Sequence, residues 1–135
     1  MWSSLKNYSD AALLFLRITL GGLFIRLHGW PMLAGGVSKW KTVGGAMKHL
    51  GITFLPAFWG FMAAFSESIG CLLLVIGLFF RPSALMLVLT LLVAAIDDFA
   101  KPQGSLVAAS HALELMLVFF TLIFVGPGRF SVDKG

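Results

Sequence analysis

Four long apolar runs dominate this 135-residue chain and constrain its fold more than any other feature. They extend over roughly residues 11–34, 54–80, 83–100 and 105–125. Each approaches the ~20 residues that a helix needs to cross the ~30 Å hydrocarbon core of a bilayer. Hydrophobic residues make up 59% of the chain and charged residues 12%, an excess that so short a chain cannot bury in its own core. The sequence therefore predicts an all-α integral membrane protein in contact with the lipid bilayer.

Short connections join these runs into antiparallel neighbours. Arg81-Pro82 predicts a tight hairpin between the second and third runs, because proline cannot continue a helix and biases the preceding residue away from helical geometry. Residues 97–104 make an equally short polar connection, and residues 35–53 form the one extended loop. The first run has no signal-peptide cleavage pattern, so we expect it to be a retained span. The predicted architecture is one domain over residues 1–135, an up-down-up-down four-helix bundle.

The net charge indicates membrane topology and not nucleic-acid binding. The formal charge is +4, but the basic residues are scattered and two lie inside apolar runs, so we expect no nucleic-acid partner. With four spans, both termini share one side of the membrane, and we place them in the cytoplasm as a working hypothesis. The positive-inside count itself is tied, with Lys6, Arg81, Arg129 and Lys134 on one side and Lys39, Lys41, Lys48 and Lys101 on the other.

Six ionisable residues inside the runs are the candidate functional residues: Arg17, Arg26, His28, Glu67, His111 and Glu114. A charge near the bilayer centre costs at least ~2.5–3.5 kcal/mol, and such residues usually face the bundle interior and pair with one another. Helical rise places five of them at about 16–26 Å from the side of the termini, and Arg17 at about 9 Å. We therefore expect a polar cluster toward the side of residues 35–53.

Helical phase indicates which of these residues can meet. On the first helix, 100° per residue puts Arg17 and His28 on one face and Arg26 about 180° from Arg17. Glu67 shares its face with small residues, which let membrane helices approach closely. We therefore expect Arg17 or His28 to pair with Glu67 or with Glu114. Arg26 would then extend to the membrane surface or meet a second protomer, which makes the chain a candidate homo-oligomer.

Three kinds of redox site can be considered for this set of residues: a haem, a di-iron centre and a quinone site. His28 and His111, from different helices at similar depth, could be axial ligands of a haem, but paired histidines more often form hydrogen bonds. His111 and Glu114 have the spacing of a di-iron motif in reverse, but that centre needs a second such pair, so we predict no metal. A quinone needs hydrogen-bond donors and a proton path, which His and Glu supply.

We accordingly assign His28, Glu67, His111 and Glu114 as candidate catalytic residues, with His28 and His111 as the contacts of a quinone cofactor. Arg17 and Arg26 are structural charge partners. The alternative is that the same residues form ion pairs that only hold the helices in register. The sequence contains no P-loop, dinucleotide fingerprint, G-x-S-x-G elbow or Cys-x-x-Cys, so self-contained hydrolysis or phosphoryl transfer is not expected.

A set of residues spread over the chain resembles the DoxX/DoxD-like family of small four-span bacterial membrane proteins. The set comprises Arg17, Gly21, His28, Gly29, Glu67, Gly70, Gly77, Leu78, Arg81, Ala84, Glu114 and the segment 126–133, GPGRFSVD. Two positions depart from the family pattern: Met32 replaces a frequent Lys, and Cys71 replaces a frequent Gly.

The resemblance implies a multi-pass protein of the bacterial inner membrane. Relatives are associated with thiosulfate:quinone oxidoreduction, with membrane oxidoreductase assemblies for thiol and oxidative stress, and with maturation of periplasmic redox proteins. We therefore expect a subunit of a quinone-linked oxidoreductase that needs a membrane or periplasmic redox partner. A non-catalytic membrane scaffold or a small-solute carrier is the alternative.

Overall fold

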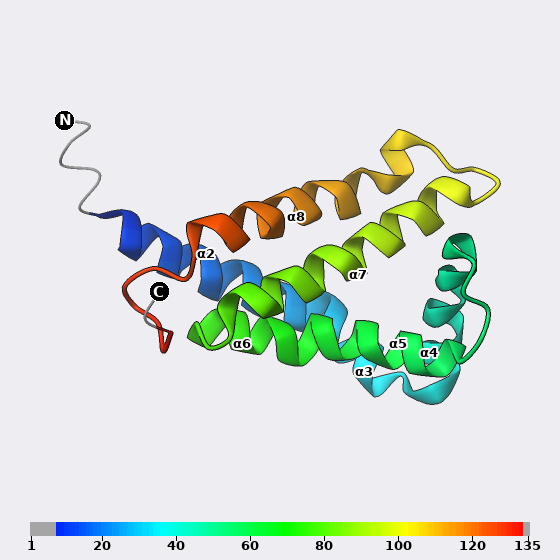
Figure 1. Cartoon of the computed structure of the whole chain (residues 1–135), viewed down its shortest axis with the longest axis horizontal. Helices are drawn as coiled ribbons and strands as arrows, with labels where there is room; N and C mark the ends of the chain where they lie inside the picture. Colours follow the sequence, from blue (N-terminus) through cyan, green and yellow to red (C-terminus); the bar gives the residue numbers. More distant parts are fainter. Residues whose placement is uncertain (1–7, 134–135) are drawn as a thin grey trace.

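The four predicted spans are helices in the computed structural model, which describes residues 8–133 (Figure 1). The first span consists of α2 (Ser9–Phe24), the π-helix η2 (Ile25–Gly29) and α3 (Trp30–Ala34). The second span consists of α5 (Pro56–Phe65), the π-helix η4 (Ser66–Gly70) and α6 (Cys71–Ile76). The third and fourth spans are the single helices α7 (Phe80–Ala100) and α8 (Leu106–Val125). All four are long and apolar enough to cross a membrane. The predicted all-α membrane bundle is confirmed. Lys6 and Lys134, two of the residues in the charge count, lie outside the described residues.

The helices run up-down-up-down, and the segment after α8 returns to the end of the bundle where α2 begins (Figure 1). α8 packs along α7, α2 packs against α6, and α7 contacts both η4 and α6. Between α2 and α8, contact is made by side chains such as Phe24 and Phe119, whose ring centroids lie 5.7 Å apart. The helices therefore lie side by side in the order α2, α6, α7 and α8. Aromatic side chains of α2 and α8 meet and complete the bundle.

The turn between the second and third spans lies earlier than predicted. The second span ends at Ile76, and the third begins at Phe80, so the predicted hairpin at Arg81-Pro82 is wrong. Gly77 (φ 78°) and Phe79 (φ 48°) adopt left-handed backbone and reverse the chain, which glycine does at no steric cost. Pro82 lies in the first turn of α7, where its missing N–H breaks no helical hydrogen bond.

Residues 35–53 are mostly helical, so the extended loop predicted there is also wrong. They contain α4 (Gly36–Gly44) and the 3-10 helix η3 (Gly45–Leu50), which together we call the arm. The arm packs against α5 through glycines: a Cβ on Gly44 would collide with the carbonyl of Pro56, and one on Gly60 with that of Trp40. Gly44, a glycine within the predicted loop, therefore serves as a point of close helix contact.

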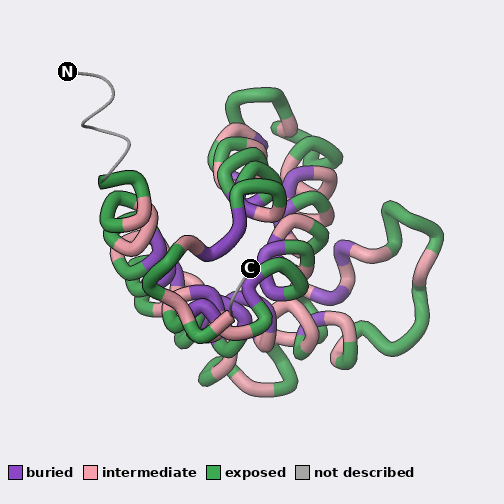
Figure 2. Tube along the Cα trace, turned by 60° about the vertical axis from the view of Figure 1, so that its left-hand side comes forward, coloured by how far each residue is buried: buried purple, intermediate pink, exposed green. Residues whose placement is uncertain are grey.

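Apolar side chains lie on both the inside and the outside of the bundle, as expected of a protein whose solvent is lipid. Figure 2 shows the buried residues on the inward faces of the helices. The core is built around Phe80, Leu87 and Phe119, which are fully buried. Outward faces carry exposed apolar residues such as Phe15 (70% exposed) and Val107 (82% exposed). Water would not tolerate so much exposed apolar surface, whereas hydrocarbon does.

Candidate functional site

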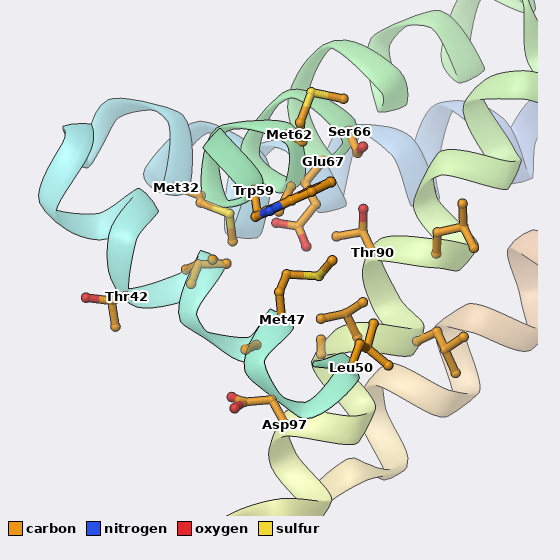
Figure 3. A pocket seen from close by; sticks show the side chains of 18 of the residues that line it. Met32, Thr42, Met47, Leu50, Trp59, Met62, Ser66, Glu67, Thr90 and Asp97 are labelled. Carbon is orange, nitrogen blue, oxygen red and sulfur yellow. The ribbon is translucent and has the colours of Figure 1, made fainter. Parts of the chain in front are cut away.

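A cavity of about 650 Å³ lies between the arm, the second span and α7 (Figure 3). Most of its wall is apolar, and four of the six methionines of the chain contribute to it: Met32, Met47, Met62 and Met86. Methionine is flexible and polarizable, so such a wall adapts to ligands of different shape. A mostly apolar cavity with a few polar groups is the usual form of a small-molecule site.

Two polar side chains in this cavity are buried without a partner. Glu67 is 6% exposed, and its Oε2 has no hydrogen-bond partner among the described residues. The indole Nε1 atom of Trp59 is also buried and has no hydrogen-bond partner among the described residues. In Figure 3 both side chains project between Met32 on one side and Thr90 of α7 on the other. A buried polar group without a hydrogen bond costs about 1–3 kcal/mol, so two of them on one cavity favour a ligand that satisfies both.

The position of Glu67 follows from irregular backbone. Glu67 lies in η4, and η4 packs against the other π-helix, η2. The contact is tight, because a Cβ on Gly29 of η2 would collide with the backbone carbonyl of Glu67. A π turn adds one residue to a helical turn and shifts the direction of the side chains around it, and such turns are frequent at functional sites. No sequence pattern indicated either π turn.

A group of charged residues surrounds the outer end of the cavity. His49 Nε2 of the arm lies 3.1 Å from Asp97 Oδ1 of α7. Lys101 Nζ lies 2.9 Å from Asp98 Oδ1 and 3.6 Å from Asp97 Oδ2. The hydrogen bond to Asp98 and the two negative charges raise the pKa of the exposed Lys101 above its usual value. The His49–Asp97 contact ties the arm to α7 and so helps to close one wall of the cavity.

The structure brings two of the predicted residues together, but away from the cavity. The rings of His28 and His111 lie 5.5 Å apart between centroids, and the ring of Phe24 lies 4.9 Å from that of His28. Neither histidine lines the cavity that Glu67 faces. Glu114 is exposed on α8 and does not line it either. The predicted cluster is therefore divided into a cavity residue, a histidine pair and an exposed carboxylate.

Arg17 pairs with no carboxylate among the described residues, so the predicted ion pair with Glu67 or Glu114 is wrong for this residue. Its side chain is 1% exposed, and its guanidinium donates to four backbone carbonyls. The acceptors are Leu74 (from Nε, 3.1 Å), Val75 (from Nη2, 2.6 Å), and Pro127 and Phe130 (from Nη1, 3.1 and 2.6 Å). Carbonyls in the last turn of a helix lack helical partners, so Arg17 stabilises the end of α6 and the segment after α8.

His28 likewise has no ion pair with Glu67 or Glu114 among the described residues, so the predicted pairing is wrong for His28 as well, and its neighbours are aromatic rings. The residue that the sequence did not indicate is Trp59. Tryptophan in a span usually marks the interface or ordinary packing, whereas the N–H of Trp59 is buried without a partner beside a cavity that the arm helps to form. Within residues 8–133, no group of three or more His, Cys, Asp or Glu side chains is placed to hold a metal ion.

Comparison with known proteins identifies the family. The DoxX family model matches residues 12–100, about two thirds of the chain. The chain belongs to the DoxX family. No curated protein and no solved structure matches the chain. The DoxX match extends from α2 to the end of α7, so it includes Arg17, Glu67 and the whole arm. The segment that carries His111 and Glu114 lies beyond it.

Proposed function

We propose that this DoxX-family protein is a subunit of a quinone-linked oxidoreductase in the bacterial inner membrane, and that the cavity beside Glu67 receives the quinone head group. The observation that carries the proposal is the pair of buried, unpartnered polar atoms on Glu67 and Trp59. A quinone is an apolar ring with two carbonyl oxygens, which suits an apolar wall with a few hydrogen-bonding groups. The ligand is delivered from the bilayer, in which the spans lie.

The two polar side chains have distinct roles on this proposal. The Trp59 N–H can only donate a hydrogen bond, so it binds one carbonyl oxygen. Glu67 donates to the other carbonyl when protonated and accepts from a quinol hydroxyl when ionised. Quinone supplies two-electron carrier chemistry: two electrons from a membrane or periplasmic redox partner and two protons convert it to quinol. Glu67 is positioned to transfer one of these protons.

The other predicted residues take supporting roles. His28 and His111 lie outside the cavity, so we assign them to proton transfer and not to contact with the ring. Gly29, the neighbour of His28, lies against the backbone of Glu67, so His28 is on the helix next to η4, and His111 meets it from α8. The redox partner acts in sulfur, thiol or oxidative-stress chemistry, and the chain termini are on the cytoplasmic side.

Quinone titration of the purified protein in nanodiscs tests the proposal. Short-chain ubiquinone or menaquinone should bind and quench tryptophan fluorescence in a saturable way. Glu67→Leu should weaken binding at least about 10-fold, because both hydrogen-bonding modes are lost. Glu67→Gln should retain most of the affinity, because its amide still donates, but should slow quinone turnover in the assembled complex at least about 100-fold.

Tryptophan offers a matched control. Trp59→Phe should weaken binding about 5–10-fold through loss of one hydrogen bond. Trp30→Phe should leave it unchanged, because Trp30 is 59% exposed and does not line the cavity. Absence of saturable binding by both quinones, or full affinity in Glu67→Leu, would refute the proposal.

The alternative is a non-catalytic membrane scaffold or small-solute carrier. It is supported by the Arg17 network, which is a structural device that needs no ligand. On that alternative neither quinone binds, and Glu67→Gln changes stability or assembly while turnover per assembled complex stays constant.

A further inference from the structure

Two charged side chains inside the spans have no partner within the part of the chain that the structure describes. Arg26 lies in η2 and Glu114 lies in α8, and both are exposed. Neither forms a hydrogen bond or ion pair with any other described residue. An unpaired charge in the hydrocarbon region costs at least ~2.5–3.5 kcal/mol, and such residues usually pair with one another. The described helices by themselves leave this requirement unmet at two positions.

Arg26 and Glu114 lie at the same level of the bundle. On α2 and η2, Arg26 is midway between Phe24 and His28. Phe24 contacts Phe119 of α8, and His28 contacts His111 of α8. Glu114 lies between those two contacts on α8. The two ring contacts therefore bracket both charges, and a partner for one charge must lie at the depth of the other.

The two charges do not pair with each other within the described chain. Phe24 and His28 face α8, and Arg26 is two residues from each of them. Arg26 therefore lies on a different side of the first span from these two rings, and it forms no ion pair with Glu114 of the same chain. Glu114 is three residues from His111, so it lies on the neighbouring outward flank of α8. The surface around these charges is apolar and exposed, with Leu23 at 60% and Leu117 at 59%.

We propose that a second copy of this chain packs against the exposed surface of the first span and α8 that carries Arg26, Glu114, Leu23 and Leu117, with Arg26 of each protomer paired to the partner's Glu114. A two-fold axis along the membrane normal keeps every residue at its own depth, so charges at equal depth in one chain also meet at equal depth across the axis. Such an interface is isologous: each subunit offers one positive and one negative side chain, and two ion pairs form. The dimer then leaves neither charge unpaired in lipid.

The charges favour a second copy over a different membrane protein. An unrelated partner would have to supply both an acid and a base at the depth of Arg26 and Glu114. A second copy supplies both without further conditions. The dimer also leaves the cavity accessible, because the cavity is bounded by the arm, the second span and α7. The proposal is therefore independent of quinone binding.

Charge reversal tests the dimer. Subunits are counted by single-molecule photobleaching in nanodiscs, and the wild type should show two. Arg26→Glu and Glu114→Arg should each give single subunits, because each places like charges opposite one another. The two single variants, co-expressed with different tags, should purify together. In that mixed dimer the two substituted side chains face each other with opposite charges, and the second site keeps the native Arg26 opposite the native Glu114. Lys39→Glu, on the exposed arm surface, should remain dimeric.

The co-expression result separates pairing between chains from pairing within one chain, since a pair within the chain would stay broken in both variants. A single-subunit wild type, or failure of the two inserted variants to purify together, would overturn the proposal. If either reversed variant fails to insert, Arg26→Gln and Glu114→Gln replace them. Each should weaken dimerisation at least about 10-fold in dilution experiments, and unchanged dimerisation in both would equally overturn it.

Discussion

Arg17 and Phe130, which are 113 residues apart in the chain, are joined by a 2.6 Å hydrogen bond from Arg17 Nη1 to the carbonyl oxygen of Phe130. The same guanidinium also donates to Leu74, Val75 and Pro127. One side chain on the first span therefore holds the end of the second span and the segment that follows the fourth. The four hydrogen bonds make Arg17 the main polar link between distant parts of the described fold.

Arg17→Gln should destabilise the protein by about 3 kcal/mol or more. Glutamine has two donors and a shorter reach, so at least two buried carbonyls lose their partner at a cost of about 1–3 kcal/mol each. Equilibrium unfolding in mixed micelles measures the change. Arg129→Gln is the matched control, because Arg129 is exposed and its loss should cost under about 0.5 kcal/mol. Equal costs for the two variants would show that the Arg17 hydrogen bonds do not hold the fold.

Gly77→Ala should cost about 2 kcal/mol or more. Gly77 has a φ of 78°, which disfavours any side chain, and a Cβ there would collide with Ser131 and approach Arg17 Nη2 to 2.7 Å. Thermal unfolding in detergent measures the loss. Gly45→Ala provides the contrast, because nothing lies within 4 Å of that Cβ position and the backbone is right-handed. That variant should be as stable as the wild type, and a similar loss in both would contradict the prediction.

Glu67→Leu should leave the protein as stable as the wild type or stabilise it by about 1 kcal/mol. Leucine removes a buried carboxyl oxygen that has no hydrogen-bond partner among the described residues, and so removes its desolvation cost. Urea or SDS titration of ligand-free protein measures the effect. Arg17→Leu should shift stability in the opposite direction, because it removes the four hydrogen bonds that the guanidinium donates to backbone carbonyls. A loss of more than about 1 kcal/mol in Glu67→Leu would indicate that Glu67 has a structural partner.

His49→Ala should loosen the arm. His49 contributes a side-chain contact of 3.1 Å from η3 to Asp97 of α7, and partly exposed pairs of this kind contribute about 0–1 kcal/mol. Amide hydrogen exchange over residues 45–50 should therefore accelerate by up to about 5-fold. Lys48→Ala, at an exposed neighbouring position, should leave exchange unchanged. An unchanged rate in His49→Ala would mean that apolar packing alone holds the arm.

The turn between the second and third spans shows where prediction from sequence stopped. Gly77 and Pro82 are both helix breakers, and the sequence does not say which one ends the helix. The choice is made by the segment after α8: Val132 N donates to Ile76 O, and Asp133 N donates to Gly77 O. The carboxylate of Asp133 also accepts from Phe80 N, at the start of α7. These contacts stabilise a turn at residues 77–79 and require the whole fold.

The candidate site likewise contains one residue that could be predicted from the sequence and one that could not. Glu67 could be predicted because an ionisable residue in an apolar run is informative on its own. Trp59 could not, because a buried N–H without a partner is a property of the folded cavity and not of the residue type. Gly44 of the arm could not be distinguished from a loop residue in the sequence, because glycine permits both a turn and a close helix contact.

The membrane environment, the number of spans and their antiparallel order follow from the amino-acid sequence alone, because a lipid bilayer requires about 20 consecutive apolar residues per helix and this requirement is local. The partners of the polar residues, in contrast, depend on how the helices and the C-terminal segment pack together. Arg17 could have met a carboxylate or a carbonyl, and the outcome depended on which groups at the end of α6 and after α8 lacked hydrogen bonds. Span formation depends on the residue and its chain neighbours, whereas pairing depends on groups that only the complete fold brings within reach.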